Sequence, residues 1–353
     1  MTERRWLLVV SPATTTSEWT QATESFAQSL MATAEEFLTP VRAGPNGWVR
    51  PTDRAPVASP DFRDVVVICA AGWDDQAQLP LLQAAHAAGA RLVLYVHDLT
   101  PIRRPEWFPA EQSRRFADWL TSLLGMSRMI IAPSSATIRD IEALRRRSNL
   151  ADAPAKRIRP GDSVLPHPGD KLPPQSHFVL MPTPLDPRVG HAVVLSAWRR
   201  LGARSAPGSL PRLVIVGPSG HLTANLRDRL TLGLPDVAYL PNATPVAVSA
   251  MLDACLFVVH PAPLEGWGFV VSEALARGKP VFAANSGGIP EAGQRSARYF
   301  DPLDTDELAR HVERALRDPH DLRRWNNDIA ANFIPRSWDE AAMEFLTALA
   351  GLP

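Results

Sequence analysis

Short apolar runs rich in β-branched residues recur along the chain, and most of them precede a helical pattern. Fully apolar short runs are typical of strands that are covered on both faces. Strands that alternate with helices predict βαβ units and therefore parallel sheets. The runs form two sets, LLVVS, VVVICA, RLVLYVHD and MIIAPS before residue 135, and HFVLMP, RLVIVGP, VAYLP, LFVVHP, PVFAAN and ARYF from 177 to 300. We therefore expect two doubly wound α/β domains, with ligand loops at the carboxyl ends of their strands.

Two segments interrupt this pattern. Residues 160–176 contain five prolines and two glycines and lie between the two sets of strands, so they predict an interdomain linker. Residues 39–60 are also rich in proline and glycine, and we expect a loop there. The total of 353 residues exceeds the usual size of a single hydrophobic core, which agrees with two domains.

The composition is that of an ordinary soluble globular protein. Lys plus Arg and Asp plus Glu both total 37, and 45% of the residues are hydrophobic, so no nucleic-acid partner is indicated. Cys69 and Cys255 lie in apolar runs, which predicts buried reduced thiols and a cytoplasmic location. No stretch approaches the roughly 18 apolar residues of a membrane span. Any membrane contact is expected to be peripheral, at the cytoplasmic face.

A basic segment offers one reason for such a contact. The stretch from Leu99 to Lys171 holds 13 Lys and Arg against 8 Asp and Glu. A solvated helix face accounts for this excess, and the weaker alternative is contact with anionic lipid head groups or a lipid-diphosphate acceptor.

Two glutamates stand eight positions apart in EGWGFVVSEALARGKPV, residues 265–281. The pattern predicts Glu265 on a strand-to-helix loop and a helix from Phe269 to Arg277. The glycines permit close approach of the backbone to a ligand, and a helix start favours a phosphate group. Glu273, one turn into the helix, could then accept hydrogen bonds from ribose hydroxyls. On the pattern alone, a solvated helix glutamate is the more common alternative.

Other motifs point away from competing chemistries. Val271 stands where a dinucleotide fingerprint requires its third glycine, and Lys279 ends a helix where a P-loop lysine would begin one. Asp304 and Asp306 precede a helical pattern, which favours an N-cap and a first-turn acid over a metal site. No His/Cys cluster has metal-ligand spacing and no GxSxG elbow occurs, so we expect neither a metal ion nor another cofactor.

The motif EGWGFVVSEA resembles the E-x7-E signature of retaining glycosyltransferase family 4, whose members have the GT-B fold. The likeness extends over about residues 91–345. It includes RLVIVGPSGH, GGIPEAG followed by ARYFDP, SWDEAA and APSSATIRDI. YVHDLTPIRRPEWF is similar to a segment of bacterial mannosyl- and rhamnosyltransferases that build surface polysaccharides. In the first 90 residues only an initial strand matches, because PATTTSEW replaces the family's glycine-rich turn.

The resemblance implies two Rossmann-like domains that face each other across a cleft. Residues 1–170 would bind the acceptor, joined by a returning C-terminal helix over 338–353, and residues 171–337 would bind the donor. Glu273 would hold the nucleotide ribose, and Glu265 the hydroxyls of the transferred sugar. His97 would lie across the cleft near the reacting carbon, although a loop-end histidine satisfied by backbone is the alternative. The other implied site residues are, on the donor side, Gly217, Ser219, Gly220, Gly266, Gly268, Phe269 and Val270, and on the acceptor side Asp98, Ser134 and Thr137.

One departure from the family pattern concerns the donor diphosphate. Thr183 and Val189 occupy the positions of the family's Arg and Lys, which leaves Arg188 as the neighbouring cation. His191, charged at lower pH, is a second local source of charge.

We predict transfer of a mannose- or rhamnose-like hexose, with retention and without metal, from a nucleotide sugar such as GDP-mannose. The acceptor would be a growing, lipid-linked surface glycan such as O-antigen or exopolysaccharide, with contacts to the inner membrane or to other polysaccharide-assembly enzymes. The alternative is a catalytically silent GT-B protein that binds a glycan or nucleotide and serves another transferase. An α/β oxidoreductase has only the sheet pattern in its favour.

Overall fold

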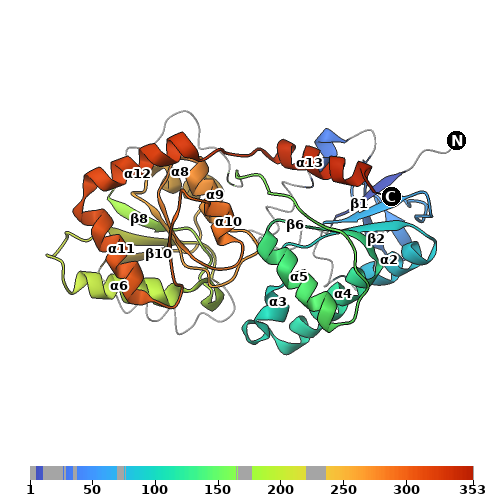
Figure 1. Ribbon diagram of the computed structural model, residues 1–353, viewed down its shortest axis with the longest axis horizontal. Coiled ribbons are helices and arrows are strands. Elements are labelled where there is room, and N and C mark those ends of the chain that lie inside the picture. Colours follow the sequence, from blue (N-terminus) through green and yellow to red (C-terminus); the bar gives the residue numbers. More distant parts are fainter. Residues whose placement is uncertain are drawn as a thin grey trace. The chain divides into compact units, whose positions relative to one another are not determined.

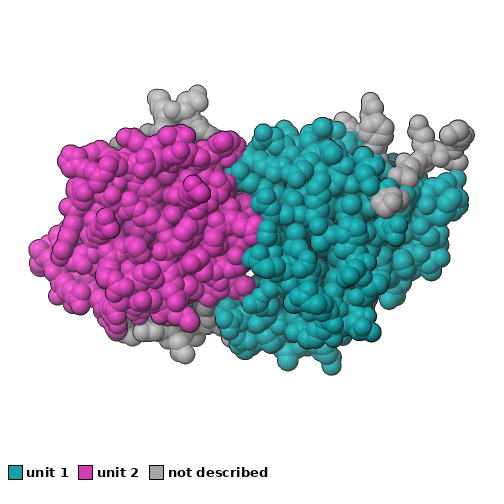
Figure 2. Space-filling model, viewed as in Figure 1, with its two compact units in different colours: residues 1–161, 336–353 teal, residues 162–335 magenta. Residues whose placement is uncertain are grey.

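The computed structural model describes residues 5–10, 27, 29–34, 38–69, 75, 77–163, 165, 177–219 and 236–352. The chain divides into two compact units, which Figure 2 shows in different colours. Unit 1 comprises residues 1–161 and 336–353, and unit 2 comprises residues 162–335. The sequence places the boundaries nine and two residues later, at 170/171 and 337/338. The first boundary differs because Leu165 packs against the core of unit 2, so unit 2 begins at residue 162, within the proline-rich segment.

Unit 1 contains a seven-stranded sheet in the order β3-β2-β1-β4-β5-β6-β7. The paired strands are parallel except for β2 and β3, which are antiparallel. The strands are β1 (Trp6–Val9), β2 (Leu38–Gly44), β3 (Gly47–Val49), β4 (Val65–Ile68), β5 (Arg91–Tyr95), β6 (Ser127–Ala132) and β7 (Ala155–Arg157).

The expected loop over residues 39–60 is wrong in its first part, because β2 and β3 form a hairpin there. The hairpin turns at Pro45 and Asn46, and Gly47 has a φ of 133°, which favours glycine. Val41 and Trp48 are buried, and β2 pairs with β1 along its first four residues. Pairing with β1 and the burial of these two side chains stabilise the hairpin. The prolines and glycines of the segment had predicted a loop instead.

The sheet of unit 1 is covered on both faces by helices (Figure 1). Neighbouring residues of one strand enter different cores, as Val66 and Val67 of β4 do. The core that contains Val67 also contains Phe345 and Leu349 of α13, so the last helix belongs to unit 1. The helices are α2 (Gln78–Ala87), α3 (Thr100–Arg103), η2 (Pro105–Trp107), α4 (Ala110–Met126), α5 (Ser135–Arg147) and α13 (Trp338–Ala350).

Unit 2 contains a six-stranded parallel sheet in the order β10-β9-β8-β11-β12-β13. Each of its strands falls on one of the six apolar runs identified in the sequence. The strands are β8 (Phe178–Met181), β9 (Arg212–Val216), β10 (Val237–Leu240), β11 (Val258–His260), β12 (Val281–Ala284) and β13 (Arg298–Phe300). The helices are η3 (Pro187–Val189), α6 (His191–Gly202), α8 (Pro245–Ala254), α9 (Phe269–Ala276), α10 (Ile289–Gly293), α11 (Thr305–Arg317) and α12 (Pro319–Asn332).

The strand order of unit 2 reverses at β8. From β8 the chain builds outward through β9 and β10 on one side, and through β11, β12 and β13 on the other. In an open α/β sheet the loops at the carboxyl ends of the strands on either side of such a reversal diverge and leave a crevice for a ligand. A ligand site is therefore expected at the loops after β8 and β11.

The cysteines and the longer helices bear on the predicted thiols and on membrane insertion. Cys69 and Cys255 are both free and buried, as predicted, and burial raises the pKa of the Cys255 thiol to about 12. Within the described ranges, no helix is long and apolar enough to span a bilayer.

Candidate functional site

Glu265 lies on the loop that follows β11, and a neighbouring loop fixes its backbone. The Gly288 N–H donates to the Glu265 carbonyl oxygen at 2.8 Å. Gly287 has a φ of 57°, and a Cβ on it would lie 2.3 Å from the same oxygen. A glycine is therefore required where the 285–288 loop passes under Glu265.

The Glu265 side chain is paired with a buried histidine. His260, the last residue of β11, donates from Nε2 to Glu265 Oε2 at 3.0 Å. The Glu265 side chain retains 28% of its exposure, whereas the His260 side chain is almost completely buried. The Glu265 carboxylate is therefore held in place but still accessible to a ligand. His260 at the end of β11 determines the direction of this carboxylate.

Glu273 lies in the second turn of α9 and is buried. Its Oε1 atom accepts one hydrogen bond from the Leu165 N–H and one from Arg277 Nη2, both at 3.0 Å. The solvated-helix alternative for this glutamate is wrong, because a buried carboxylate with two donors is held in place.

The start of α9 has the backbone that a glycine loop predicts. Gly268 caps the helix with a φ of 113°, and a Cβ there would meet Ile289 at 3.4 Å. Gly266 is buried, and Phe269 and Val270 are half-buried at the first turn. This loop lies at the carboxyl end of β11, between the two glutamates.

The loop after β8 holds Arg188 in an ion pair. Arg188 donates to both carboxylate oxygens of Asp186, from Nε at 2.8 Å and from Nη2 at 2.6 Å. Burial raises the pKa of Asp186, but the hydrogen bonds from Arg188 outweigh burial and leave this pKa below its usual value. The Arg188 side chain is still 40% exposed, so part of it remains accessible to solvent.

His191 and Thr183 are buried in the same loop region. His191 Nδ1 donates to the Asp186 carbonyl at 3.0 Å, and burial lowers the pKa of His191 to about 4. The charge expected on His191 at lower pH would therefore appear only at about pH 4 and below. Within the described part of the chain, His191 Nε2 and Thr183 Oγ1 have no hydrogen-bond partner.

The loop after β9 packs directly against the loop after β8. Gly217 has a φ of 152°, and a Cβ on it would lie 2.6 Å from the Thr183 carbonyl oxygen. Ser219 forms an isolated parallel bridge with Leu185. Gly220, the remaining predicted donor-side residue, lies outside the described residues.

In unit 1, the predicted site residues gather after β5 and β6. His97 is half-buried and its ring contacts the Tyr95 edge, with centroids 4.7 Å apart. Burial lowers the pKa of His97 to about 4, and a hydrogen bond to the Cys69 backbone opposes this shift. Thr137 Oγ1 donates to the His97 carbonyl at 3.4 Å, which links the two strand ends.

The residues predicted for the acceptor side have local structural roles. Asp98 Oδ1 accepts from the Thr100 N–H at 2.7 Å, and Ser134 caps α5 by accepting from the Thr137 N–H at 3.0 Å. All three predicted side chains, those of Asp98, Ser134 and Thr137, are buried. Their structural roles are the caps and turns that these residue types favour.

Three residues of the site were not singled out in the sequence: His260, Asp186 and Arg277. Arg277 follows Glu273 by four positions, a spacing at which opposite charges meet on a helix, so this pair was detectable. Asp186 and Arg188 are two positions apart on a turn, for which no helical rule applies. Nothing in the sequence around His260 distinguishes it from an ordinary strand residue.

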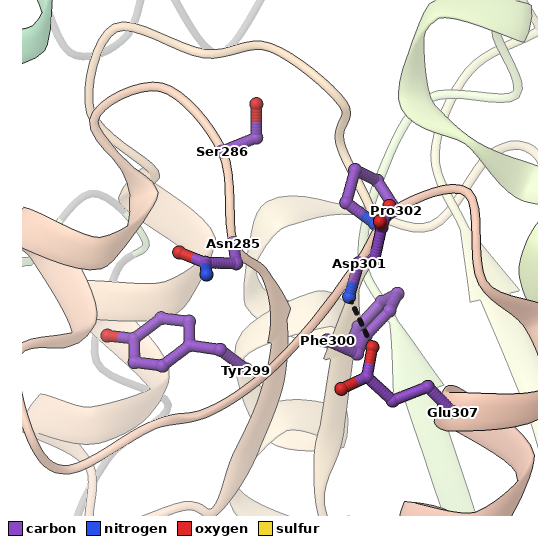
Figure 3. A pocket seen from close by; sticks show the side chains of 7 residues that line it. All are labelled: Asn285, Ser286, Tyr299, Phe300, Asp301, Pro302 and Glu307. Carbon is purple, nitrogen blue, oxygen red and sulfur yellow. Dashed lines mark hydrogen bonds between the residues drawn. The ribbon is translucent and has the colours of Figure 1, made fainter.

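A cavity of about 360 Å³ opens beside the 285–288 loop (Figure 3). It is lined by Asn285, Ser286, Tyr299, Phe300, Asp301, Pro302 and Glu307. Ser286 also donates from Oγ to the Pro263 carbonyl at 2.6 Å. Asn285 and Ser286 of the loop that supports Glu265 thus line this cavity, whereas Glu265 and Glu273 do not.

The expected N-cap at Asp304 is confirmed. Asp304 Oδ1 accepts from the N–H groups of Asp306 and Glu307 at 2.8 and 2.9 Å, and Asp306 lies in the first turn of α11. Among the residues that the structure describes, no group of three or more His, Cys, Asp or Glu side chains has the arrangement to hold a metal ion.

Parts of the chain are similar in sequence to known glycosyltransferases. Residues 167–331 match the family described as "Glycosyl transferases group 1". The serotype-specific mannosyltransferase WbdA of Escherichia coli is 26% identical over 256 residues, which cover 67% of this chain and 31% of WbdA. The D-inositol 3-phosphate glycosyltransferase of Rhodococcus opacus strain B4 is 29% identical over 193 residues, which cover 53% of this chain and 43% of that enzyme. The chain thus spans less than half the length of either relative.

Solved structures show the fold. HepE of Anabaena, in complex with UDP and glucose, superposes with a TM-score of 0.69 and 17% identity over 99% of this chain and 100% of HepE. Sucrose-phosphate synthase of Thermosynechococcus elongatus gives a TM-score of 0.68 with 18% identity and covers 99% of both chains. The fold is GT-B, with two parallel-sheet α/β domains.

Proposed function

We propose that this protein is a retaining, metal-independent hexosyltransferase that moves a mannose- or rhamnose-like sugar from a nucleotide sugar to a growing surface glycan. The observation that carries the proposal is the pair Glu265 and Glu273, one on the loop after β11 and one buried in α9, at the carboxyl edge of the unit 2 sheet. The similarity to WbdA supports mannose, with GDP-mannose as the donor that the sequence resemblance favours. HepE, in complex with UDP and glucose, supports a nucleotide sugar as the donor class.

The two carboxylates would divide the donor between them. Glu273 accepts hydrogen bonds from ribose hydroxyls, while Glu265, held by His260, accepts from hydroxyls of the transferred sugar near its anomeric carbon. The acceptor hydroxyl attacks on the face from which the diphosphate departs. A bond forms between that oxygen and the anomeric carbon, the bond to the phosphate oxygen breaks, and the hydroxyl proton passes to the departing phosphate.

The departing diphosphate needs positive potential. Arg188 would provide it from the loop after β8, where its side chain is 40% exposed. Backbone N–H groups at the start of α9 and near Gly217 would add to it. His97 and its neighbours in unit 1 would serve the acceptor side, in the role that the sequence resemblance implies.

A second candidate function follows from the ion pair of Arg188. Thr183 and Val189 replace the two cations of the family pattern, and Asp186 already compensates the charge of Arg188. A GT-B protein with a weakened diphosphate clamp could bind a nucleotide or glycan without transfer and serve a partner transferase.

Donor hydrolysis and transfer by the purified protein separate the two functions. A panel of GDP- and UDP-sugars is screened first by thermal shift, because a ligand at 100 times its Kd stabilises a protein by roughly 2.7 kcal/mol. We expect one donor to raise the melting temperature and to be hydrolysed slowly, with activity retained in EDTA. Stabilisation without turnover of any donor would favour the silent binding protein, and recovery of activity by Mn²⁺ after chelation would refute metal independence.

Variants of the two glutamates test the division of labour. Glu273→Ala should weaken the binding of free nucleotide and nucleotide sugar alike. Glu265→Ala should spare free nucleotide and lower turnover, the pattern of a contact made mainly in the transition state. An equal loss of nucleotide affinity in both variants would contradict these roles.

The acceptor and the location are part of the same proposal. A lipid-linked glycan acceptor would bring the protein to the cytoplasmic membrane face, where the basic excess between Leu99 and Lys171 favours anionic lipid. Sedimentation with vesicles that contain anionic lipid, at low and at physiological salt, measures this contact.

A further inference from the structure

Arg277 follows the last residue of α9 and connects that helix to α8. Its Nη2 donates to Glu273 Oε1 at 3.0 Å, and its Nη1 donates to Ser249 Oγ at 2.7 Å and to the Asp253 carboxylate at 3.2 and 3.3 Å. The Arg277 side chain is only 13% exposed. These hydrogen bonds are shielded from water and salt, so they fix the guanidinium more firmly than surface pairs would.

The backbone N–H and carbonyl of Leu165 complete the arrangement. The Leu165 N–H donates to Glu273 Oε1 at 3.0 Å, and the Leu165 carbonyl accepts from Arg277 Nη2 at 3.4 Å. Glu273, Arg277 and the backbone of Leu165 therefore form a closed ring of three hydrogen bonds. A carboxylate in such a ring has little freedom to rotate.

The charges in this cluster make Arg277 difficult to replace. Glu273 and Asp253 are two carboxylates with side-chain exposures of 5% and 7%, and the Arg277 guanidinium is bonded to both. Buried carboxylates are costly without a compensating cation. Removal of Arg277 would leave two like charges close together and free Glu273 to turn.

We propose that Arg277 is a positioning residue for the nucleotide ribose. Together with the Leu165 N–H, it holds the Glu273 carboxylate in the orientation that accepts hydrogen bonds from the ribose hydroxyls, although Arg277 itself meets no ligand atom. The inference rests on the proposed contact of Glu273 with ribose. Hydrogen bonds weaken steeply when misaligned, so selectivity for ribose depends on Arg277.

The test compares nucleotides with and without ribose hydroxyls. Titration calorimetry of the full chain measures the Kd of UDP and GDP and of their 2′,3′-dideoxy forms for the wild type, Arg277→Met, Glu273→Gln and the double variant. We expect the wild type to prefer the better-bound ribonucleotide by about tenfold or more, the effect of one or two hydrogen bonds to a charged group. In Arg277→Met this ratio should fall close to one, while the affinity for the dideoxy form stays within about twofold of wild type.

The double variant shows whether Arg277 acts through Glu273. If it does, the double variant should bind the ribonucleotide no more weakly than the single variants. Arg298→Met is the matched control, because Arg298 also pairs with an aspartate of unit 2, Asp321, at 2.6 Å. This control should retain the full ratio.

A purely structural role for Arg277 predicts another result. Both nucleotide forms would then lose affinity equally and the ratio would persist, which would overturn the proposal. If Arg277→Met does not fold, Arg277→Lys is used, which keeps the charge but cannot bridge α8 and Glu273 with a planar fork. An unchanged ratio in that variant also overturns it. A wild type that binds a nucleotide with no preference for ribose would instead refute the ribose role of Glu273.

Discussion

At the scale of single residues, the candidate donor site consists of charged side chains that are already paired. Glu265 is bonded to His260, Glu273 to Arg277, and Arg188 to Asp186. Each pair fixes the direction of a group that a ligand would have to meet. Fixed directions reduce the reorganisation that a reaction would otherwise require.

The first prediction concerns Arg188. If its guanidinium offsets the charge of the departing diphosphate, Arg188→Ala should lower kcat/KM by an amount that corresponds to about 2 to 4 kcal/mol, the range for one preorganised charge-stabilising donor. Val189→Lys should raise the rate, because it restores a cation that the family pattern has at this position. Initial rates with the identified donor measure both effects.

Arg200→Ala serves as the control, since Arg200 forms an exposed ion pair with Asp306 in the same unit. Its activity should match the wild type. An Arg188→Ala enzyme with unchanged kcat/KM would show that backbone amides suffice, or that the protein is not a transferase.

The second prediction concerns His191 and pH. Burial lowers the pKa of His191 from 6.5 to about 4 in the folded state. Between these two pH values His191 is therefore protonated in the unfolded chain and neutral in the folded chain. The contribution of neutral His191 to the free energy of unfolding is fully present above pH 6.5 and is lost as the pH falls through about 4. It corresponds to about 3 kcal/mol of unfolding free energy at most.

Urea unfolding at several pH values between 7 and 4 measures this loss. His191→Asn removes the titrating ring and keeps a donor for the Asp186 carbonyl, so its unfolding free energy should depend less steeply on pH. Identical pH dependence in the two proteins would show that His191 is not the group responsible.

At the scale of elements, glycines set how closely the site loops approach each other. The third prediction is that Gly287→Ala lowers the unfolding free energy by about 1 to 3 kcal/mol and reduces turnover more than nucleotide affinity. The reason is that a Cβ at 2.3 Å from the Glu265 carbonyl must displace the loop that carries this glutamate.

Gly208→Ala is the control that distinguishes backbone strain from the close contact with Glu265 as the cause of lost turnover. Gly208 has a φ of 76°, but nothing lies within 4 Å of the position that its Cβ would take, so this variant incurs only the backbone strain. Its turnover should equal that of the wild type. If both variants lost turnover equally, the close approach to Glu265 would not be the cause.

At the scale of the whole molecule, the two units differ in how the chain builds them. Unit 2 is one continuous segment with its own core, whereas unit 1 needs a helix from the far end of the chain. The fourth prediction is that the excised segment 162–335 folds cooperatively and binds nucleotide, because both glutamates and Arg277 lie in it. Circular dichroism melting and calorimetry provide the measurement.

Deletion of residues 336–353 from the full chain is the complementary case. It removes Phe345 and Leu349, both fully buried, and full burial of each such side chain contributes about 1.5 to 3 kcal/mol. Unit 1 should then melt at a lower temperature while unit 2 melts as before. Cooperative loss of both units together would contradict their independence.

The sequence by itself determined ten of the thirteen strands that the structure describes, all except β2, β3 and β7, together with their parallel pairing within two α/β units and the spacing of the two glutamates. These depend on local pattern: an apolar run of a few residues needs cover on both faces, and a glycine loop before a helix places Glu265 and Glu273 at the end of β11. The tertiary structure alone decided the β2–β3 hairpin, because its stability comes from pairing with β1, a partner distant in sequence. It also decided the pairing of Glu265 with His260, of Arg188 with Asp186, and of Glu273 with the peptide of Leu165. The reason is that the direction of a side chain depends on which loops and strand ends the fold brings together. This holds for residues that are close in sequence, such as His260 and Glu265, and for residues that are far apart, such as Leu165 and Glu273, which are separated by 108 positions.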